Sequence, residues 1–100
     1  MLKEIYEQPK AIKDTLRGRL NVSKVIIKMS GMDDYINKFL SAKKITIIAC
    51  GTSWHSALVG EYMFEKISKI PVEVEYASEF RYRDPIIEKD DIIIAISQSG

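Results

Sequence analysis

The chain has 100 residues, of which 46% are hydrophobic and 29% charged, with five glycines, three prolines and one cysteine. This composition excludes a disordered tail, a collagen-like repeat and a disulfide-stapled scaffold, and it indicates a single globular domain or a piece of one. Fifteen basic and fourteen acidic residues leave a formal net charge of +1, so bulk electrostatics gives no support for a nucleic-acid or anionic-membrane partner, and an anionic ligand would need a local site.

Residues 1–41 form a polar segment that favours helices, and we predict a domain boundary near Ala42. Apolar residues recur every three to four positions over residues 2–16, which is typical of an amphipathic helix. Pro9 lacks an amide hydrogen and disfavours the helical conformation of the residue before it. The helix is therefore expected either to kink at Pro9 or to give way to a second helix that ends near Gly18.

The rest of this segment carries weaker signals. Residues Val22 to Met29 are ambiguous between strand and helix. Acidic residues open the stretch from Asp33 to Leu40, as in the first turn of many helices. We expect a short helix there, with Ile36, Phe39 and Leu40 facing inward.

Residues 42–100 alternate apolar strands with helices, starting with a β-branched run from Ile45 to Cys50. A continuous run of this kind predicts a parallel strand covered on both faces. The spacing over residues 54–68 then predicts a helix with Thr52 or Ser53 as its N-cap. Its apolar face is expected to comprise Ala57, Gly60, Phe64 and Ile67.

Two further strands follow. Val72, Val74 and Tyr76 alternate with glutamates, which predicts a strand with one exposed face near a sheet edge. Residues 78–82 are expected to form a helical turn. The run from Ile92 to Ile96 is uniformly apolar and predicts a third, buried strand.

This order of strand, helix, strand, turn and strand predicts an open parallel α/β sheet with right-handed crossovers. We expect a flavodoxin-like, three-layer fold over residues 42–100, preceded by a helical lead-in over residues 1–41. The sequence stops after the third strand, before a helix that would cover it. Because an uncovered parallel sheet exposes apolar surface and an unpaired edge, we expect an incomplete domain from a longer protein.

Two loops are candidate binding elements, because ligands of open parallel sheets bind at the carboxyl ends of the strands. They are Cys50-Gly51-Thr52-Ser53 and Ser97-Gln98-Ser99-Gly100. Small residues allow a ligand to approach closely, and hydroxyl, amide and helix N-terminal N–H groups bind anions without lysine. Neither loop matches a dinucleotide-binding or P-loop motif, and neutral donors suit a monophosphate. The alternatives are a capped strand-to-helix turn for the first loop and a frayed chain end for the second.

Other reactive residues have simpler interpretations. Cys50 ends a buried strand, so a packing role is favoured over nucleophilic catalysis. His55, the only histidine, is expected on the surface of the helix. Solvation, or alternatively pairing at an interface, is expected for the charged residues Glu73, Glu75, Glu79, Arg81 and Arg83.

The sequence also indicates a compartment. The single cysteine cannot form an intramolecular disulfide, and no cysteine–histidine cluster has the spacing of a zinc site. No apolar run approaches the roughly 18–20 residues of a transmembrane helix, and the charged N-terminus is unlike a signal peptide. We therefore expect a cytoplasmic protein with no metal, no cofactor and no membrane or nucleic-acid partner.

A resemblance to a known family is carried by five segments: residues 3–9 (KEIYEQP), 17–19 (RGR), 49–53 (ACGTS), 77–83 (ASEFRYR) and 96–100 (ISQSG). In this order they resemble the glutamine–fructose-6-phosphate aminotransferases, over essentially the whole chain. CGTS and SQSG alone would indicate only the wider sugar isomerase (SIS) domain family, which includes phosphosugar isomerases and sugar-phosphate-sensing regulators. The EIYEQP and SEFRYR segments narrow the resemblance to the aminotransferases.

The resemblance implies an enzyme in which ammonia from a glutaminase domain passes to an isomerase domain. There, fructose 6-phosphate is converted to glucosamine 6-phosphate, and glutamine becomes glutamate. The chain would be the first part of the first SIS domain, whose CGTS and SQSG loops hold the sugar phosphate in such enzymes. Carried over, the resemblance implies ligands at Thr52, Ser53, Ser97, Gln98 and Ser99, with Cys50 and Gly51 lining the site through their backbone.

The resemblance assigns no catalytic residue to this chain. The proton-transferring carboxylate, the Schiff-base lysine and the ring-opening histidine of such enzymes lie in later parts of their sequences. We therefore expect the chain alone to be inactive, because acid–base chemistry needs positioned groups. Its expected partners are a sugar phosphate, the glutaminase domain, the remaining isomerase domain and a second copy in a homodimer. A non-catalytic SIS module that senses a sugar phosphate is the alternative.

Overall fold

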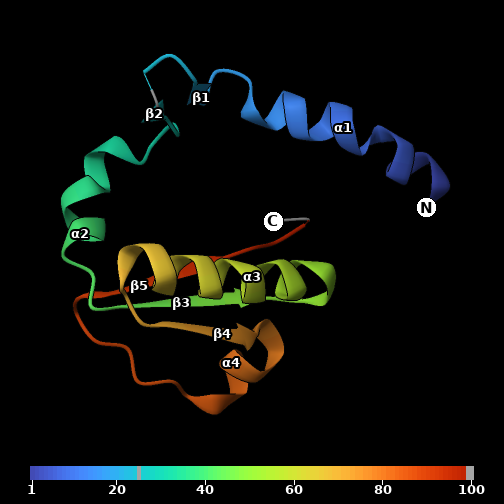
Figure 1. The fold of residues 1–100 in the computed structure, drawn as a ribbon. Helices are drawn as coiled ribbons and strands as arrows, with labels where there is room; N and C mark the ends of the chain where they lie inside the picture. Colours follow the sequence, from blue (N-terminus) through green and yellow to red (C-terminus); the bar gives the residue numbers. More distant parts are fainter. Residues whose placement is uncertain (25, 99–100) are drawn as a thin grey trace. The chain divides into compact units, whose positions relative to one another are not determined.

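The computed structural model describes residues 1–24 and 26–98 (Figure 1). The chain forms two compact units, Met1–Tyr35 and Ile36–Gly100. Within the described residues, no helix is long and apolar enough to cross a membrane.

The first unit begins with the helix α1 (Leu2–Leu16) and continues into a small hairpin. One helix covers the whole range across Pro9, so the alternative in which a second helix starts at Pro9 is wrong. The strands β1 (Leu20–Asn21) and β2 (Ile26–Ile27) pair antiparallel, which assigns most of the ambiguous stretch to a strand and its turn. A 3₁₀ turn, η1 (Asp33–Tyr35), ends this unit.

The second unit opens with the short helix α2 (Ile36–Leu40). Phe39 packs against the hydrophobic core, as predicted. Ile36 and Leu40, however, are 48% and 79% exposed, so the prediction that they face inward is wrong. A helix of five residues makes little more than one turn, and it directs only one of these side chains to the core.

A parallel sheet of three strands forms the centre of the second unit. Its strands are β3 (Lys44–Ala49), β4 (Val72–Tyr76) and β5 (Asp91–Ala95), in the order β4-β3-β5. Both neighbours pair parallel to β3, which places β4 at an edge of the described sheet as predicted. This is the strand order of the flavodoxin-like doubly wound sheets, and it confirms the predicted α/β fold.

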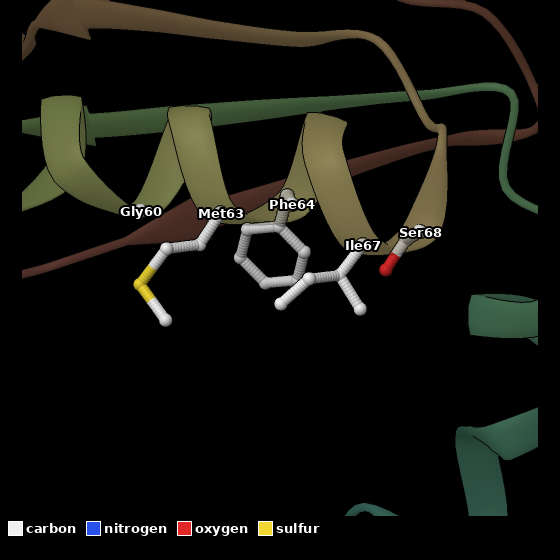
Figure 2. Close-up of a pocket in the computed structure, with 5 residues that line it drawn as sticks. All are labelled: Gly60, Met63, Phe64, Ile67 and Ser68. Atoms are coloured by element: carbon white, nitrogen blue, oxygen red, sulfur yellow. The ribbon is translucent and has the colours of Figure 1, made fainter.

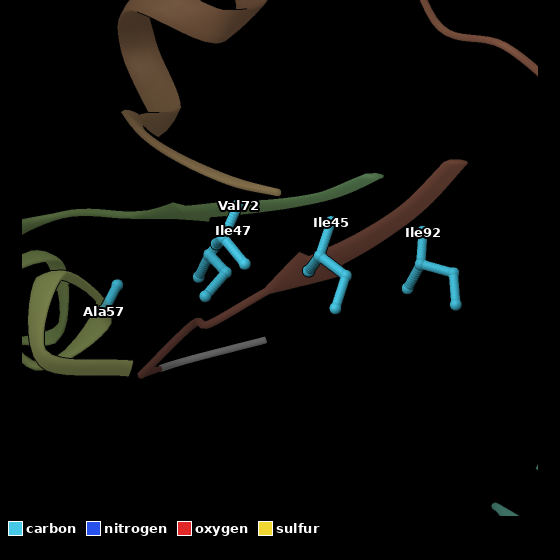
Figure 3. Close-up of a cluster of buried hydrophobic side chains, with 5 residues drawn as sticks. All are labelled: Ile45, Ile47, Ala57, Val72 and Ile92. Atoms are coloured by element: carbon cyan, nitrogen blue, oxygen red, sulfur yellow. The ribbon is translucent and has the colours of Figure 1, made fainter. Parts of the chain in front are cut away.

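The long helix α3 (Gly51–Ser68) follows β3 and packs on one face of the sheet. Side chains at paired register positions point to the same face of a parallel sheet. They form, together with one alanine of α3, the buried cluster shown in Figure 3: Ile45, Ile47, Ala57, Val72 and Ile92.

Two burial predictions fail at the margins of this core. Phe64 and Ile67 on α3 are 37% and 74% exposed, because the side of the helix that turns to the sheet is buried or half-buried only from Ser53 to Glu61. In β5 only Ile92 is buried, and Ile93 is 38% exposed. The uniform hydrophobicity of β5 wrongly predicted burial, since β5 has a neighbour on only one side in the described sheet.

The last helix, α4 (Ala77–Arg83), begins directly after β4, where a helical turn is predicted. It ends at Asp84, which adopts a left-handed conformation with φ of 52°. An extended connection then leads to β5.

Candidate functional site

The carboxyl ends of all three strands lie at one edge of the sheet, because the strands are parallel. The segments that leave this edge are the Cys50–Ser53 loop after β3, the start of α4 after β4, and residues 96–98 after β5. The N–H of Ile96 donates a hydrogen bond to the carbonyl of Ile48 at 3.0 Å, which continues the pairing past Ala95. Ser97 and Gln98 are thereby held beside the end of β3.

A cleft of about 870 Å³ opens between these segments. Its lining residues are Ile48, Cys50, Gly51, Thr52, Ser53, Ala77, Ala95, Ile96, Ser97 and Gln98. The structure therefore brings six of the seven predicted ligand residues to one cleft. The seventh, Ser99, lies outside the described residues.

The cleft lies where ligands bind in doubly wound sheets. From β3 the chain crosses to β4 on one side, and from β4 it returns past β3 to β5 on the other side. The strand order therefore reverses beside β3, and such a topological switch point is the usual ligand crevice of open α/β sheets.

The start of α3 differs from the prediction. The helix begins at Gly51, with Cys50 as an N-cap that makes no side-chain hydrogen bond, so the prediction of Thr52 or Ser53 as N-cap is wrong. Gly51 has a φ of +59°, and this left-handed conformation lets the chain turn from strand into helix one residue after Cys50. Thr52 and Ser53 consequently lie in the first helical turn, beside the cleft.

The electrostatic character of the cleft comes from neutral donors. The first N–H groups of a helix have no intrahelical partner and carry a partial positive charge, so they attract anions. The hydroxyls of Thr52 and Ser53 donate no hydrogen bond to another described residue. No charged side chain is among the described lining residues, and the first turn of α3 has no acidic residue. Such a surface can bind an anion, but it offers no carboxylate, imidazole or amine for proton transfer.

Sequence reasoning predicted the wrong environment for Cys50 and missed several of the residues that line the cleft. Cys50 is exposed at the cleft rather than buried, because β3 ends one residue earlier, at Ala49. Ile48, Ala77 and Ala95 were not predicted to line a site. Ala77 could have been found, since it follows a predicted strand at the same edge of the sheet. His55 lies on the helix surface as predicted, with its ring edge-on to Trp54 at 5.1 Å.

An ion pair braces the β4–α4 corner next to the cleft. Nη2 of Arg83 lies 2.6 Å from Oε2 of Glu75, whose side chain is only 19% exposed. The hydrogen bond that Arg83 donates to the Glu75 carboxylate raises the pKa of the Arg83 guanidinium above its usual value. Glu75 and Arg83 were predicted to be solvated charges; the prediction is wrong for Glu75, whereas the side chain of Arg83 is 48% exposed.

Another hollow lies along one side of α3 and is smaller, at about 290 Å³ (Figure 2). Its lining residues are Gly60, Met63, Phe64, Ile67 and Ser68. A single side-chain hydroxyl among apolar groups does not suit a phosphate.

Comparisons with known proteins agree with this geometry. The family model of the SIS domain matches residues 38–100. Glutamine–fructose-6-phosphate aminotransferases of Bacteroides thetaiotaomicron and Chlorobaculum tepidum are 58% and 55% identical over 100 residues. The chain spans 16% of the length of these curated relatives.

A solved structure extends the comparison to three dimensions. It is the C-terminal domain of glucosamine-fructose-6-phosphate aminotransferase from Francisella tularensis, which is 41% identical and superposes with a TM-score of 0.81. The match covers 98% of this chain and 26% of that one. The chain therefore belongs to the SIS domain family and corresponds to the SIS region of a glutamine–fructose-6-phosphate aminotransferase.

Proposed function

We propose that the cleft at the strand ends binds the phosphate of a sugar phosphate. In this proposal the phosphate accepts hydrogen bonds from Thr52, Ser53, Ser97, Gln98 and Ser99, while Cys50 and Gly51 line the site through their backbone. The observation that supports it most is the convergence of the loops after β3 and β5 on one cleft without charged side chains, beside the N-terminus of α3. A helix N-terminus flanked by small hydroxyl residues is a recurrent phosphate site.

We further propose that the chain performs this role within a cytoplasmic, homodimeric enzyme that converts fructose 6-phosphate and glutamine to glucosamine 6-phosphate and glutamate. The similarity to aminotransferases along the whole chain supports this assignment. Its partners would be the glutaminase domain and the rest of the isomerase domain. The chain alone would be inactive, because the described lining of the cleft includes no carboxylate, imidazole or amine for acid–base catalysis.

The binding proposal is tested by amide NMR. The nitrogen-15-labelled chain is titrated with fructose 6-phosphate, and unphosphorylated fructose is the control. We expect localised shifts at residues 51–53 and 97–99 with the phosphorylated sugar alone. A dispersed spectrum that responds to neither sugar, or equally to both, would count against phosphate recognition by this cleft.

The enzymatic proposal needs a longer protein. A chimera in which this chain replaces the equivalent segment of the Bacteroides thetaiotaomicron relative should form glucosamine 6-phosphate, and a Thr52→Val chimera should need more fructose 6-phosphate for the same rate. A well-folded chimera that forms no product would contradict the assignment.

A further inference from the structure

Trp54 and Tyr76 connect two of the segments that surround the cleft. Trp54 lies in the first turn of α3, directly after the Cys50–Ser53 loop. Tyr76 ends β4, directly before Ala77, which lines the cleft. Their rings are stacked, with centroids 4.7 Å apart and planes at 20° to each other. Since neither ring is among the lining residues, the pair can affect a ligand only by positioning groups that contact it.

Among the described residues, few other contacts restrain the first turn of α3; one is a hydrogen bond that the Ser56 hydroxyl donates to the Thr52 carbonyl at 3.3 Å. Cys50 provides no side-chain cap. The hydrogen bond from Trp54 N–H to the Cys50 carbonyl is long, at 3.4 Å, compared with about 2.9–3.0 Å in a typical amide bond. Gly51 adds the backbone freedom of glycine at a φ of +59°. An uncapped turn with a weak hydrogen bond and a glycine stays ordered only where a side chain anchors it.

The partner ring is better fixed. Tyr76 is the last residue of β4, whose register with β3 extends to the pair Ala49–Tyr76. The ion pair between Glu75 and Arg83 then holds α4 against the end of the same strand. Trp54 therefore stacks on a ring whose backbone belongs to the sheet.

We propose that the stacking of Trp54 on Tyr76 positions the N–H groups of Gly51, Thr52 and Ser53 for the phosphate before the ligand arrives. Trp54 and Tyr76 are positioning residues, and their effect on affinity rests on the proposed phosphate-binding function. A turn that is already ordered saves the entropy of ordering it on binding, which is the general benefit of preorganisation. Given the coupling typical of aromatic pairs, loss of the stack should weaken sugar-phosphate binding about threefold to tenfold.

The test uses the full chain and measures two quantities, the backbone order of residues 51–53 without ligand and the affinity for fructose 6-phosphate. In Trp54→Leu, order parameters of these residues should fall from about 0.85 towards 0.6 or below, and binding should weaken by the factor above. Trp54→Phe keeps an aromatic ring, so the backbone order of residues 51–53 and the affinity should both stay close to those of the wild-type chain. Ile92→Val is the matched stability control, because Ile92 lies in the core near the amino end of β5; it should lower the unfolding midpoint and leave both quantities unchanged.

Tyr76→Leu and Tyr76→Phe repeat the comparison from the other ring, and they decide the matter if Trp54→Leu does not fold. Unchanged order and affinity in a folded leucine variant would overturn the positioning role. If the wild-type chain binds no fructose 6-phosphate while residues 51–53 lose order in the leucine variants, the proposed function fails and the positioning role stands.

Discussion

Replacing Gly51 with alanine should destabilise the second unit by about 1–2 kcal/mol, the cost of the left-handed conformation for an L residue. The φ of Gly51 is +59°, inside the region that side chains disfavour. A Cβ built at Gly51 meets no atom within 4 Å. Crowding therefore adds nothing, and the whole effect is conformational.

The alanine variant has one way to avoid this cost. If its φ becomes negative, the peptide between Cys50 and residue 51 must rotate, and the N–H groups at the start of α3 point elsewhere. Stability is then recovered, but the affinity for fructose 6-phosphate falls. The variant therefore either keeps the positive φ and loses stability, or adopts a negative φ and loses affinity for fructose 6-phosphate.

Urea unfolding followed by the fluorescence of Trp54, the single tryptophan, measures the stability of this unit. Gly60→Ala is the matched control on the same helix. Its Cβ would lie 3.9 Å from Cδ1 of Ile47, an ordinary contact, and alanine exceeds glycine in helix propensity by about 1 kcal/mol. The control should therefore be stabilised. Unchanged stability together with unchanged affinity in Gly51→Ala would refute this reasoning.

Three further predictions concern the site and the core. Thr52→Val removes a hydroxyl that we propose donates to the phosphate. The affinity for fructose 6-phosphate should therefore fall about 10- to 100-fold in a calorimetric titration, while the stability stays unchanged. An equal loss of affinity for unphosphorylated fructose would contradict this. Because the cleft uses neutral donors, raising the salt concentration from about 50 to 200 mM should weaken binding less than about threefold, whereas the steep loss typical of a lysine cluster would contradict it. Ile47→Ala, at a position only 3% exposed, should cost about 2–5 kcal/mol in urea unfolding, and a loss below 1 kcal/mol would show that the site collapses around the cavity.

The fold was predictable where its signals are local in the sequence. The β-branched run before Cys50 and the alternation over Val72–Tyr76 each encode one strand; β4 spans the predicted residues, and β3 begins and ends one residue earlier than predicted. Burial on α3 was not predictable to the same degree. Apolar spacing identifies a helix face, but it does not say how far along the helix the sheet extends, so Ile67 was predicted to face inward and is exposed.

The candidate site, too, was predictable only where its signals are local in the sequence. Both loops could be identified, because small hydroxyl residues after apolar strands have a clear physical meaning. The start of α3 could not, because the left-handed turn at Gly51 begins the helix before the hydroxyl residues that usually cap one. Ala95 joins the cleft only through strand order and register, which no local pattern encodes.

The composition of the cleft also suggests how its binding energy would be used. A phosphate is a part of the sugar that does not react, and binding energy from such a part can serve to orient the reacting carbons. Donors fixed by the sheet and by the first turn of α3 suit this task, since their cost of ordering is met during folding. Proton transfer at neutral pH is most often carried out by carboxylates, imidazoles or amines, and none of these is among the described lining residues. In the proposed function, holding the phosphate and moving protons are thus separate tasks, and the residues of this cleft suit the first.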